Sequence, residues 1–385
     1  MNRRVLLVLM LVCALVCALV VLAPRAWAQW PPETHPADQS RDIVMSWDRS
    51  AVPGDVELWA PRTVLGFSHD LAMKYGQIHV VCGSASDSEF GRCPMEGEPL
   101  PITGTSEVVL RLVEQRTGLI AEIRAIGSLL RIMSGRICTG DFWELDPRPL
   151  YSAFWFRCGV GGGANDPIGT GVELILPQRE ISRLVAGHWS ATMRLSIKAD
   201  PAAAPVATAV FNFDFTVTDY DAISIYFPGF DGVAPLVNMD LRYDPIRKVV
   251  AGRKDVDMCL YDGVGSQSEF LGVTVRDSGP RPPPGRDFAV WHQDGGSDDT
   301  QRLDYQVGLN YGGNLLAMKN GEEQLLRGID SAQLRMVLLP GISQPVYCVP
   351  TPLTLETPPT PIASKRPGLY DGELTVELRV PTAKP

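Results

Sequence analysis

The residues with the clearest chemistry in this 385-residue chain are its cysteines. Two of the eight lie in an apolar N-terminal stretch, and the other six are Cys82, Cys93, Cys138, Cys158, Cys259 and Cys348. An even number is typical of disulfides in an exported chain and predicts three bridges. Proximity favours Cys82–Cys93 and Cys138–Cys158, which leaves Cys259–Cys348, although spacing alone does not fix the pairing of the first four. A zinc site is disfavoured because the chain has no CxxC sequence and no closely spaced histidines.

Motifs for catalysis or ligand binding are missing from the sequence. It contains no HExxH, GxSxG or GxxxxGK[ST]. GVGGGAND (159–166) lacks the Lys-Ser/Thr end of a phosphate loop and predicts a turn. DGGSDD (294–299) resembles a calcium loop only loosely, since it lacks the closing acidic residue. We therefore expect no catalytic residue, no cofactor and no metal.

The N-terminus has the form of a secretory signal peptide. Arg3 and Arg4 precede an uncharged apolar stretch (5–22), Pro24 interrupts it, and residues 26–28 form a small-x-small cleavage pattern. Residues 1–28 are predicted to be removed. The alternative is a membrane anchor, because the apolar stretch is nearly long enough to span a bilayer.

The predicted mature chain (29–385) is acidic and large. It carries 32 Lys and Arg against 44 Asp and Glu, a formal charge of −12. This charge argues against a nucleic-acid partner. Its 357 residues exceed one ordinary hydrophobic core, so two domains are expected.

Alternating apolar and polar residues predict an all-β protein. Strand patterns recur along the whole chain, among them SAFWFRC (152–158), AISIYF (222–227) and LVNMDLRY (236–243), and LPQREISRL (176–184) can hold one helical turn. We expect two β-sandwiches, an N-terminal domain (29–219) and a C-terminal domain (220–385).

The last strand pattern raises the question of its partners. In GLYDGELTVELRV (368–380), Leu374, Val376, Leu378 and Val380 alternate with polar residues, which predicts a half-buried strand. A strand without a neighbour on each side is an exposed edge. Considered alone, the segment is most simply an edge strand of a complete sandwich.

Four strings in the second half carry a family resemblance. They are IYFPGFDGVAPLVNMDLRY (225–243), DMCLYDG (257–263), PVYCVPTPLTLET (345–357) and the terminal GLYDGELTVELRV. In order and spacing they resemble the CfaE/CblD-type tip adhesins and initiators of class 5 chaperone–usher fimbriae, across residues 220 to 381. The first half is similar to that family in length, strand content and tryptophan pattern.

The resemblance implies two immunoglobulin-like β-sandwich domains, an adhesin domain followed by a pilin domain that lacks its last strand. In such fimbriae a periplasmic pilus chaperone fills the vacancy first, and a donor strand from the next pilus protein, the major pilin, fills it later. The implied donor-strand groove is lined by Leu374, Val376, Leu378, Val380, Ile223, Ile225 and Phe227. Burial of four apolar side chains by a donor strand contributes about 6 to 12 kcal/mol.

The predicted mature start indicates the position in the fibre. QWPPETHPADQS (29–40) has three prolines and no alternation, so it cannot form a central donor strand. A chain that accepts a strand but cannot donate one belongs at the tip.

The first half offers candidates for receptor binding. Six of the seven tryptophans of the predicted mature chain precede residue 220; Trp47, Trp155 and Trp189 are expected in the core, and Trp143 is the best exposed candidate. Arginine suits anionic sugars such as sialic acid. The candidates near turns are Arg131, Arg136, Arg179 and Arg183, for each of which a solvated or ion-paired surface role is the commoner one.

Together these features predict a non-enzymatic fimbrial tip adhesin that initiates pilus assembly and binds a host surface glycan or glycoprotein. It would pass through the periplasm and an outer-membrane usher to the cell surface. One alternative is a secreted glycan-acting β-sandwich hydrolase, which needs two carboxylates flanking a cleft. The other is a periplasmic pilus chaperone, which also has two immunoglobulin-like domains.

Overall fold

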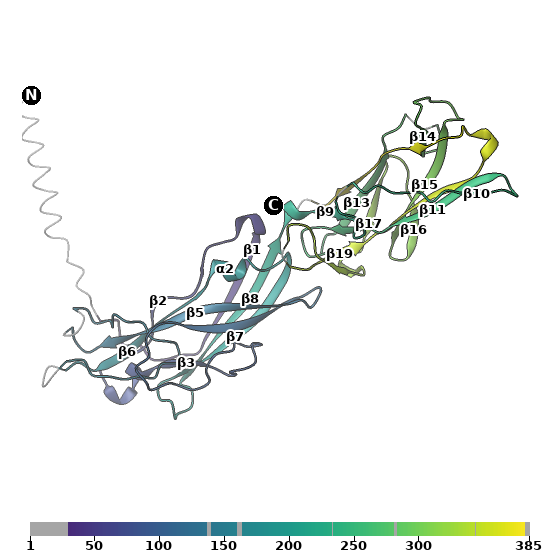
Figure 1. The fold of residues 1–385 in the computed structure, drawn as a ribbon. Helices are drawn as coiled ribbons and strands as arrows, with labels where there is room; N and C mark the ends of the chain where they lie inside the picture. The colour runs from purple at the N-terminus through teal and green to yellow at the C-terminus, as the bar shows by residue number, and fades with distance from the viewer. Residues whose placement is uncertain are drawn as a thin grey trace, which may run out of the picture.

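The computed structural model describes residues 30–136, 140–159, 164–232, 234–280, 283–342 and 344–381. The predicted signal peptide (1–28) lies outside these residues. The described chain forms two β-domains placed end to end in an elongated molecule, with the earlier strands in one domain and the later strands in the other (Figure 1). Within the described ranges, no helix is long and apolar enough to cross a membrane.

The N-terminal domain is built on one curled sheet. Its strands run in the order β1-β8-β7-β4-β5-β6-β2, and β3 pairs with β7. Their bounds are β1 (Gln39–Asp48), β2 (Val56–Phe67), β3 (His79–Cys82), β4 (Ser106–Glu114), β5 (Ile120–Met133), β6 (Pro167–Leu176), β7 (Gly187–Lys198) and β8 (Ala207–Thr218). β1 and β8 are parallel, and the other pairs of this sheet are antiparallel. The predicted helical turn is present as α2 (Gln178–Ile181).

Strict alternation along β8 supplies the centre of this domain's core. Every second residue of β8 is buried, including Phe211 and Phe215. Trp59 and Trp47 pack edge-on against these two rings, each with ring centroids 5.2 Å apart. The predictions that Trp47 and Trp189 are core residues are confirmed, since both are buried.

The C-terminal domain contains three sheets. The largest has the order β10-β11-β20-β15-β14-β21 with β16 on β15; the others are β18-β19-β12-β9 and β17-β13-β22. Their bounds are β9 (Ser224–Tyr226), β10 (Arg242–Asp244), β11 (Val249–Val256), β12 (Cys259–Tyr261), β13 (Phe270–Asp277), β14 (Phe288–His292), β15 (Arg302–Tyr311), β16 (Asn314–Ala317), β17 (Glu323–Arg327), β18 (Arg335–Val337), β19 (Val346–Pro350), β20 (Leu353–Pro361), β21 (Tyr370–Asp371) and β22 (Leu374–Arg379).

Of the predicted strands named above, 222–227 is reduced to β9, and the other two differ more from expectation. Residues 152–158 form only single bridges, and their alternation serves stacking instead: Phe154 and Phe156 lie 5.8 Å apart, with Arg148 over both rings. Of the predicted strand 236–243, only its end belongs to β10. Asn238 accepts a hydrogen bond from the backbone of Asp240, whose φ is +50°, and this turn interrupts the extended chain.

Two predicted disulfides are confirmed. Cys82–Cys93 has a Cα–Cα distance of 5.2 Å, and Cys259–Cys348 has one of 5.7 Å. The second bridge ties the neighbouring strands β12 and β19 together within the core. Cys158 is disulfide-bonded as well. The pairing predicted for it involves Cys138, which lies outside the described residues.

Polar contacts join the two domains. The Arg116 guanidinium donates to the carbonyl of Ala332 at 2.7 Å, and the Asp219 amide donates to the carbonyl of Gly263 at 2.7 Å. Within the N-terminal domain, Arg49 pairs with the Asp219 carboxylate at 2.6 Å and holds the residue whose backbone bonds to Gly263. The buried core of the N-terminal domain continues into the near end of the C-terminal domain, where it includes the Cys259–Cys348 bridge. These contacts hold the domains end to end.

Candidate functional site

The last strand has a partner on one side only among the described strands. β22 pairs antiparallel with β13, with Val376 opposite Val275 and Leu378 opposite Val273. It is the end member of the order β17-β13-β22. Its other edge therefore leaves its backbone N–H and C=O groups unpaired within the sheet, which is the condition that allows a further strand to add.

The two faces of β22 are chemically different. Leu374, Val376, Leu378 and Val380 are half-buried and pack against the core of the C-terminal domain, as predicted for an alternating strand. On the opposite face, Arg379 forms an ion pair with Glu323 at 2.6 Å, and Glu377 forms one with Arg276 at 2.9 Å. These pairs lie on the outward, solvent-exposed face of β22. The inward face remains partly open.

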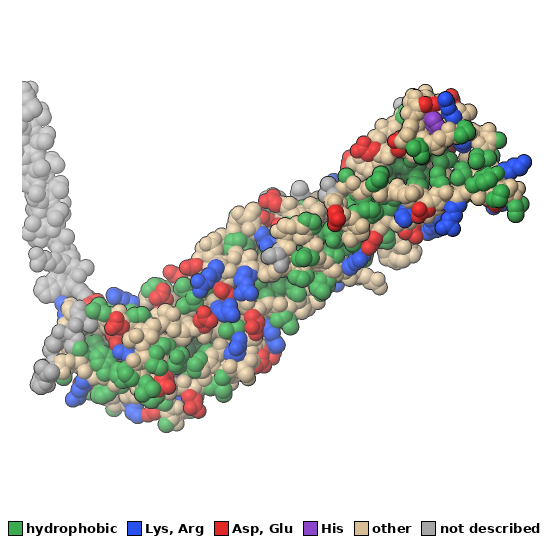
Figure 2. Space-filling view, in the orientation of Figure 1, with side chains coloured by type: hydrophobic (Ala, Val, Ile, Leu, Met, Phe, Trp, Pro, Cys, Tyr) green, Lys and Arg blue, Asp and Glu red, His purple; other side chains and the backbone are tan. Residues whose placement is uncertain are grey.

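A second strand edge borders the same core. β9 pairs with β12 and is the end member of the order β18-β19-β12-β9. Ile225 on β9 and the neighbouring Phe227 both pack into the core that β22 also contacts. Ile223 differs, because it lies against Gly263 near the domain junction. Figure 2 shows hydrophobic side chains gathered on one face of the C-terminal domain.

Arg131, predicted as a surface candidate, is corrected by the structure. It lies within β5, its side chain is fully buried, and its guanidinium donates to the carbonyls of Ile78 at 2.7 Å and Ser152 at 2.6 Å and to the Thr170 hydroxyl at 2.7 Å. Burial lowers the pKa of Arg131 to about 9, although the Glu144 carboxylate acts in the opposite direction. Its hydrogen bonds join three segments of the chain, so it is a structural residue and cannot contact a receptor from this position.

The two tryptophan predictions for this end of the domain are also corrected. Trp143 is only 9% exposed and packs with Phe67 and Ile132 in a small separate core. Its ring occupies the space over Gly171, where a Cβ would collide with it. Trp155, expected in the core, is 41% exposed instead, because its segment is not a sheet strand.

The remaining arginine candidates lie at two places. Arg179 and Arg183 lie beside the buried Glu180 at α2. The Arg183 guanidinium is 3.3 Å from the Glu180 carboxylate. Arg136 follows β5 and stacks over the Phe142 ring at 4.5 Å. The four arginine candidates therefore do not form one cluster.

Arg62 is a candidate for receptor binding that sequence reasoning missed, and the ring that it contacts is next in sequence to the ring that Arg136 contacts. Arg62 interrupts β2 with φ +63° and lies over the Trp143 ring at 5.2 Å. Trp30 stacks on Phe142 with centroids 4.3 Å apart, which brings the predicted mature start to the same surface. The proline in the APRT sequence (60–63), where β2 loses its register with β6, is the signal that could have indicated it.

Comparison with known proteins defines the class. The model of the first domain of CfaE, a CFA/I fimbrial subunit, matches residues 24–220, and that of its second domain matches residues 223–382. Together these matches cover nearly the whole chain, so the protein belongs to the CfaE family of fimbrial subunits.

Individual relatives agree with this assignment. The CFA/I fimbrial protein CfaE of Escherichia coli is 25% identical over 325 residues, which are 82% of each chain. The crystal structure of CfaE, described as the adhesive subunit of CFA/I fimbria of enterotoxigenic Escherichia coli, has a TM-score of 0.69 at 22% identity, covering 92% of this chain and 95% of that one. A chaperone–tip adhesin complex of CFA/I fimbriae gives a TM-score of 0.63 at 20% identity, covering 92% and 99%. The all-β two-domain prediction is confirmed by this fold.

Proposed function

We propose that this chain is the adhesive tip subunit of a chaperone–usher fimbria and that it starts the fibre by accepting a donor strand. The observation that supports this most strongly is β22, a strand with an open edge and a half-buried apolar face over the core of its domain. Membership in the CfaE family supplies the biological setting.

The proposed acceptor groove lies along the free edges of β22 and β9. An added strand would complete the backbone pairing of β22 and cover its four apolar side chains. Less than about a third of each side chain is exposed. Covering that part contributes at most about 2 to 4 kcal/mol in total, taking a third of the roughly 1.5 to 3 kcal/mol for full burial of one such side chain. The apolar side chains of the donor add a contribution of their own.

The proposed occupants are a periplasmic pilus chaperone first and the major pilin later, with an outer-membrane usher exchanging them. A related tip adhesin is found in complex with a chaperone, which supports the first of these partners. Export to a fimbrial tip on the cell surface follows from the same proposal. The N-terminal domain would then project from the fibre and carry receptor binding to a host surface glycan or glycoprotein, for which Arg136, Arg179 and Arg183 stay candidates.

The test is purification of the tagged full chain from the host periplasm, followed by identification of every bound protein. We expect one immunoglobulin-like chaperone in equimolar amount. Val376→Asp places a charge on the inward face of β22 and should remove the chaperone. Thr375→Asp, one residue away on the exposed outward face, is the matched control and should retain it.

Two outcomes would reject the assembly role. One is a wild-type chain that purifies alone as a stable monomer. The other is a chaperone that both variants retain equally. If Val376→Asp does not accumulate, chaperone binding by the smaller change Val376→Ala, measured as a loss of affinity relative to Thr375→Ala, keeps the test decisive.

A further inference from the structure

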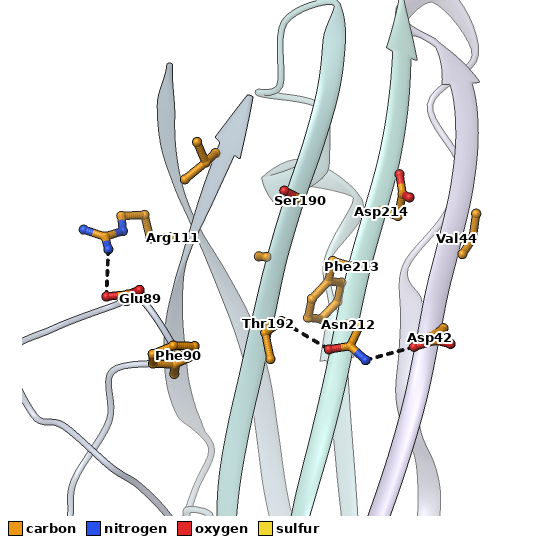
Figure 3. Close-up of a pocket in the computed structure, with 12 residues that line it drawn as sticks. Asp42, Val44, Glu89, Phe90, Arg111, Ser190, Thr192, Asn212, Phe213 and Asp214 are labelled. Atoms are coloured by element: carbon orange, nitrogen blue, oxygen red, sulfur yellow. Dashed lines mark hydrogen bonds and ion pairs between the residues drawn. The ribbon is translucent and has the colours of Figure 1, made fainter. Parts of the chain in front are cut away.

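A hollow of about 590 Å³ lies on the outer face of the N-terminal sheet, and its lining includes no residue of the acceptor groove and none of the arginine candidates. Its floor is formed by β1, β8, β7 and β4, and the loop after Cys82 forms one wall (Figure 3). The volume is within the range of small-molecule pockets. The side chains that matter for its chemistry are Asp42, Glu89, Phe90, Arg111, Asn212 and Asp214.

Strand register places the floor residues in two rows. Asp42, Asn212 and Thr192 are successive partners across β1, β8 and β7. Thr192 donates to the Asn212 amide oxygen at 3.1 Å, and the Asn212 amide nitrogen donates to Asp42 at 2.9 Å. In the next row, Val44, Asp214 and Ser190 are partners in the same way. Alternation along each strand directs all of these side chains to the outer face.

The first disulfide fixes the wall. Cys82–Cys93 closes the loop that contains Glu89 and Phe90, and the backbone carbonyl of Phe90 accepts a hydrogen bond from the Arg194 amide at 2.8 Å. The Arg194 guanidinium lies over the Phe90 ring at 4.6 Å. Phe90 is nevertheless 43% exposed. An exposed aromatic ring is thus held in a fixed position at the edge of the hollow, whose lining combines apolar and polar side chains.

The charge of the hollow is negative. Arg111 is paired with Glu89 at 3.2 Å, so its cation is already neutralised. Asp42 and Asp214 remain as the other carboxylates of the lining. Asp214 has only a distant contact with His188, at 4.0 Å, and about half of its side chain is exposed. Arg194, over the Phe90 ring, adds one cation at the edge, but the three carboxylates of the lining outnumber the cations and disfavour a sialylated or sulfated sugar.

We propose that this hollow is a binding site for a neutral oligosaccharide, separate from any arginine-based site for anionic sugars. Carboxylates accept hydrogen bonds from sugar hydroxyls, and such charge-assisted bonds are stronger than neutral ones. Phe90 offers an apolar surface to the C–H face of a sugar ring. The Thr192–Asn212–Asp42 chain of hydrogen bonds holds the Asp42 carboxylate in one orientation. The inference deepens the proposed adhesive function and rests on it.

The test is binding of the full chain, purified from the periplasm, to an array of neutral and sialylated glycans and to host cells. We expect neutral glycans to bind. Phe90→Ala and Asp214→Asn should each weaken that binding about tenfold, which is the scale of one lost ring contact or one lost charge-assisted hydrogen bond. Phe270→Ala is the matched control, because Phe270 lies under Arg379 at 4.8 Å in the other domain. It should bind neutral glycans as the wild type does.

The outcomes separate the two proposals. Binding to cells or glycans that Phe90→Ala and Asp214→Asn leave unchanged overturns this site and leaves the adhesive function standing. If the wild type binds only sialylated glycans, this site is also overturned and the adhesive function also stands. A wild-type chain that binds neither cells nor glycans overturns both. Cleavage of a bound glycan would make the carboxylates catalytic and would also overturn the assignment as a binding site. Urea unfolding of each variant checks that a loss of binding is not a loss of folding.

Discussion

Val376 and Val275 face each other across the β22–β13 pair, yet Val376 is partly exposed and Val275 is completely buried. The two valines have the same side chain and contribute to the same core. They differ because β13 has a strand on each side, β17 and β22, whereas β22 has a described partner only in β13. The contrast shows that the C-terminal domain leaves its core uncovered along one strand.

This valine pair predicts an unequal response to truncation. In the isolated chain, Val275→Ala should lower the free energy of unfolding of the C-terminal domain by about 2 kcal/mol, because it removes two buried methyl groups and leaves a cavity. Val376→Ala should cost about half as much. With the groove filled by a donor-strand peptide, the two costs should converge. Urea unfolding with and without the peptide measures this, and equal costs in its absence would contradict an open groove.

Arg131 should act on stability. Arg131→Leu leaves the carbonyls of Ile78 and Ser152 without their donor, and each unsatisfied buried group costs roughly 1 to 3 kcal/mol. We expect the free energy of unfolding of the N-terminal domain to fall by about 3 kcal/mol. Arg179→Leu, at an exposed position, should change it by less than about 0.5 kcal/mol. Similar unfolding midpoints for the two variants would refute a structural role for Arg131.

The alternation of residues along β5 predicts the buried position of Arg131, although its charge alone suggests an exposed one. From Ile123 onwards, every second residue of β5 is buried, among them Ala125, Leu129 and Met133. Arg131 belongs to the same alternating series. A buried arginine requires acceptors, and these come from Ile78, Ser152 and Thr170 in segments distant in sequence, which periodicity does not reveal. The alternation therefore predicts on which side of the sheet the Arg131 side chain lies, whereas its hydrogen-bond acceptors are seen only in the folded chain.

The alternation of apolar and polar residues predicts which side chains are buried best in strands that pair with their neighbours without a break in register. It predicts β8 and β22, and their inward residues are those expected. The exposed position predicted for Trp143 is wrong because its burial depends on the missing Cβ of Gly171 on another strand. Of the groove residues, Ile225 and Phe227 lie on the expected core, whereas the position of Ile223 at Gly263 depends on the domain junction. Contacts between distant segments account for each of these differences.

The two described disulfides should differ in their contribution to stability. Cys259 and Cys348 are 89 residues apart, so their bridge should stabilise the chain by about 4 to 5 kcal/mol through loop-closure entropy. Cys82 and Cys93 are 11 apart, which gives about 3 kcal/mol. Paired Cys→Ala variants in urea unfolding should follow that order. A larger loss from the short bridge would show that local packing, not loop closure, dominates.

Asp48 should make folding sensitive to acid. Burial raises the pKa of Asp48, but hydrogen bonds from Ser50, Thr218 and Tyr220 outweigh it and lower the pKa to about 2, from an ordinary value of 3.8. A carboxyl whose folded pKa is depressed stabilises the fold above its unfolded pKa and loses that contribution as the pH falls. Stability should therefore decline between about pH 4 and pH 2. In Asp48→Asn the decline over this interval should be shallower, and identical pH profiles of the free energy of unfolding would exclude the effect.

The proposed function requires the C-terminal domain to accept a strand from another chain. The most direct measurement is the unfolding temperature of the C-terminal domain within the full chain, refolded with and without a synthetic peptide of the major pilin's N-terminal extension. We expect a low unfolding temperature without the peptide and a rise with increasing peptide concentration, since a ligand that binds only the folded state stabilises it. A scrambled peptide should have no effect. A domain that is already stable and does not respond to the peptide would contradict the account.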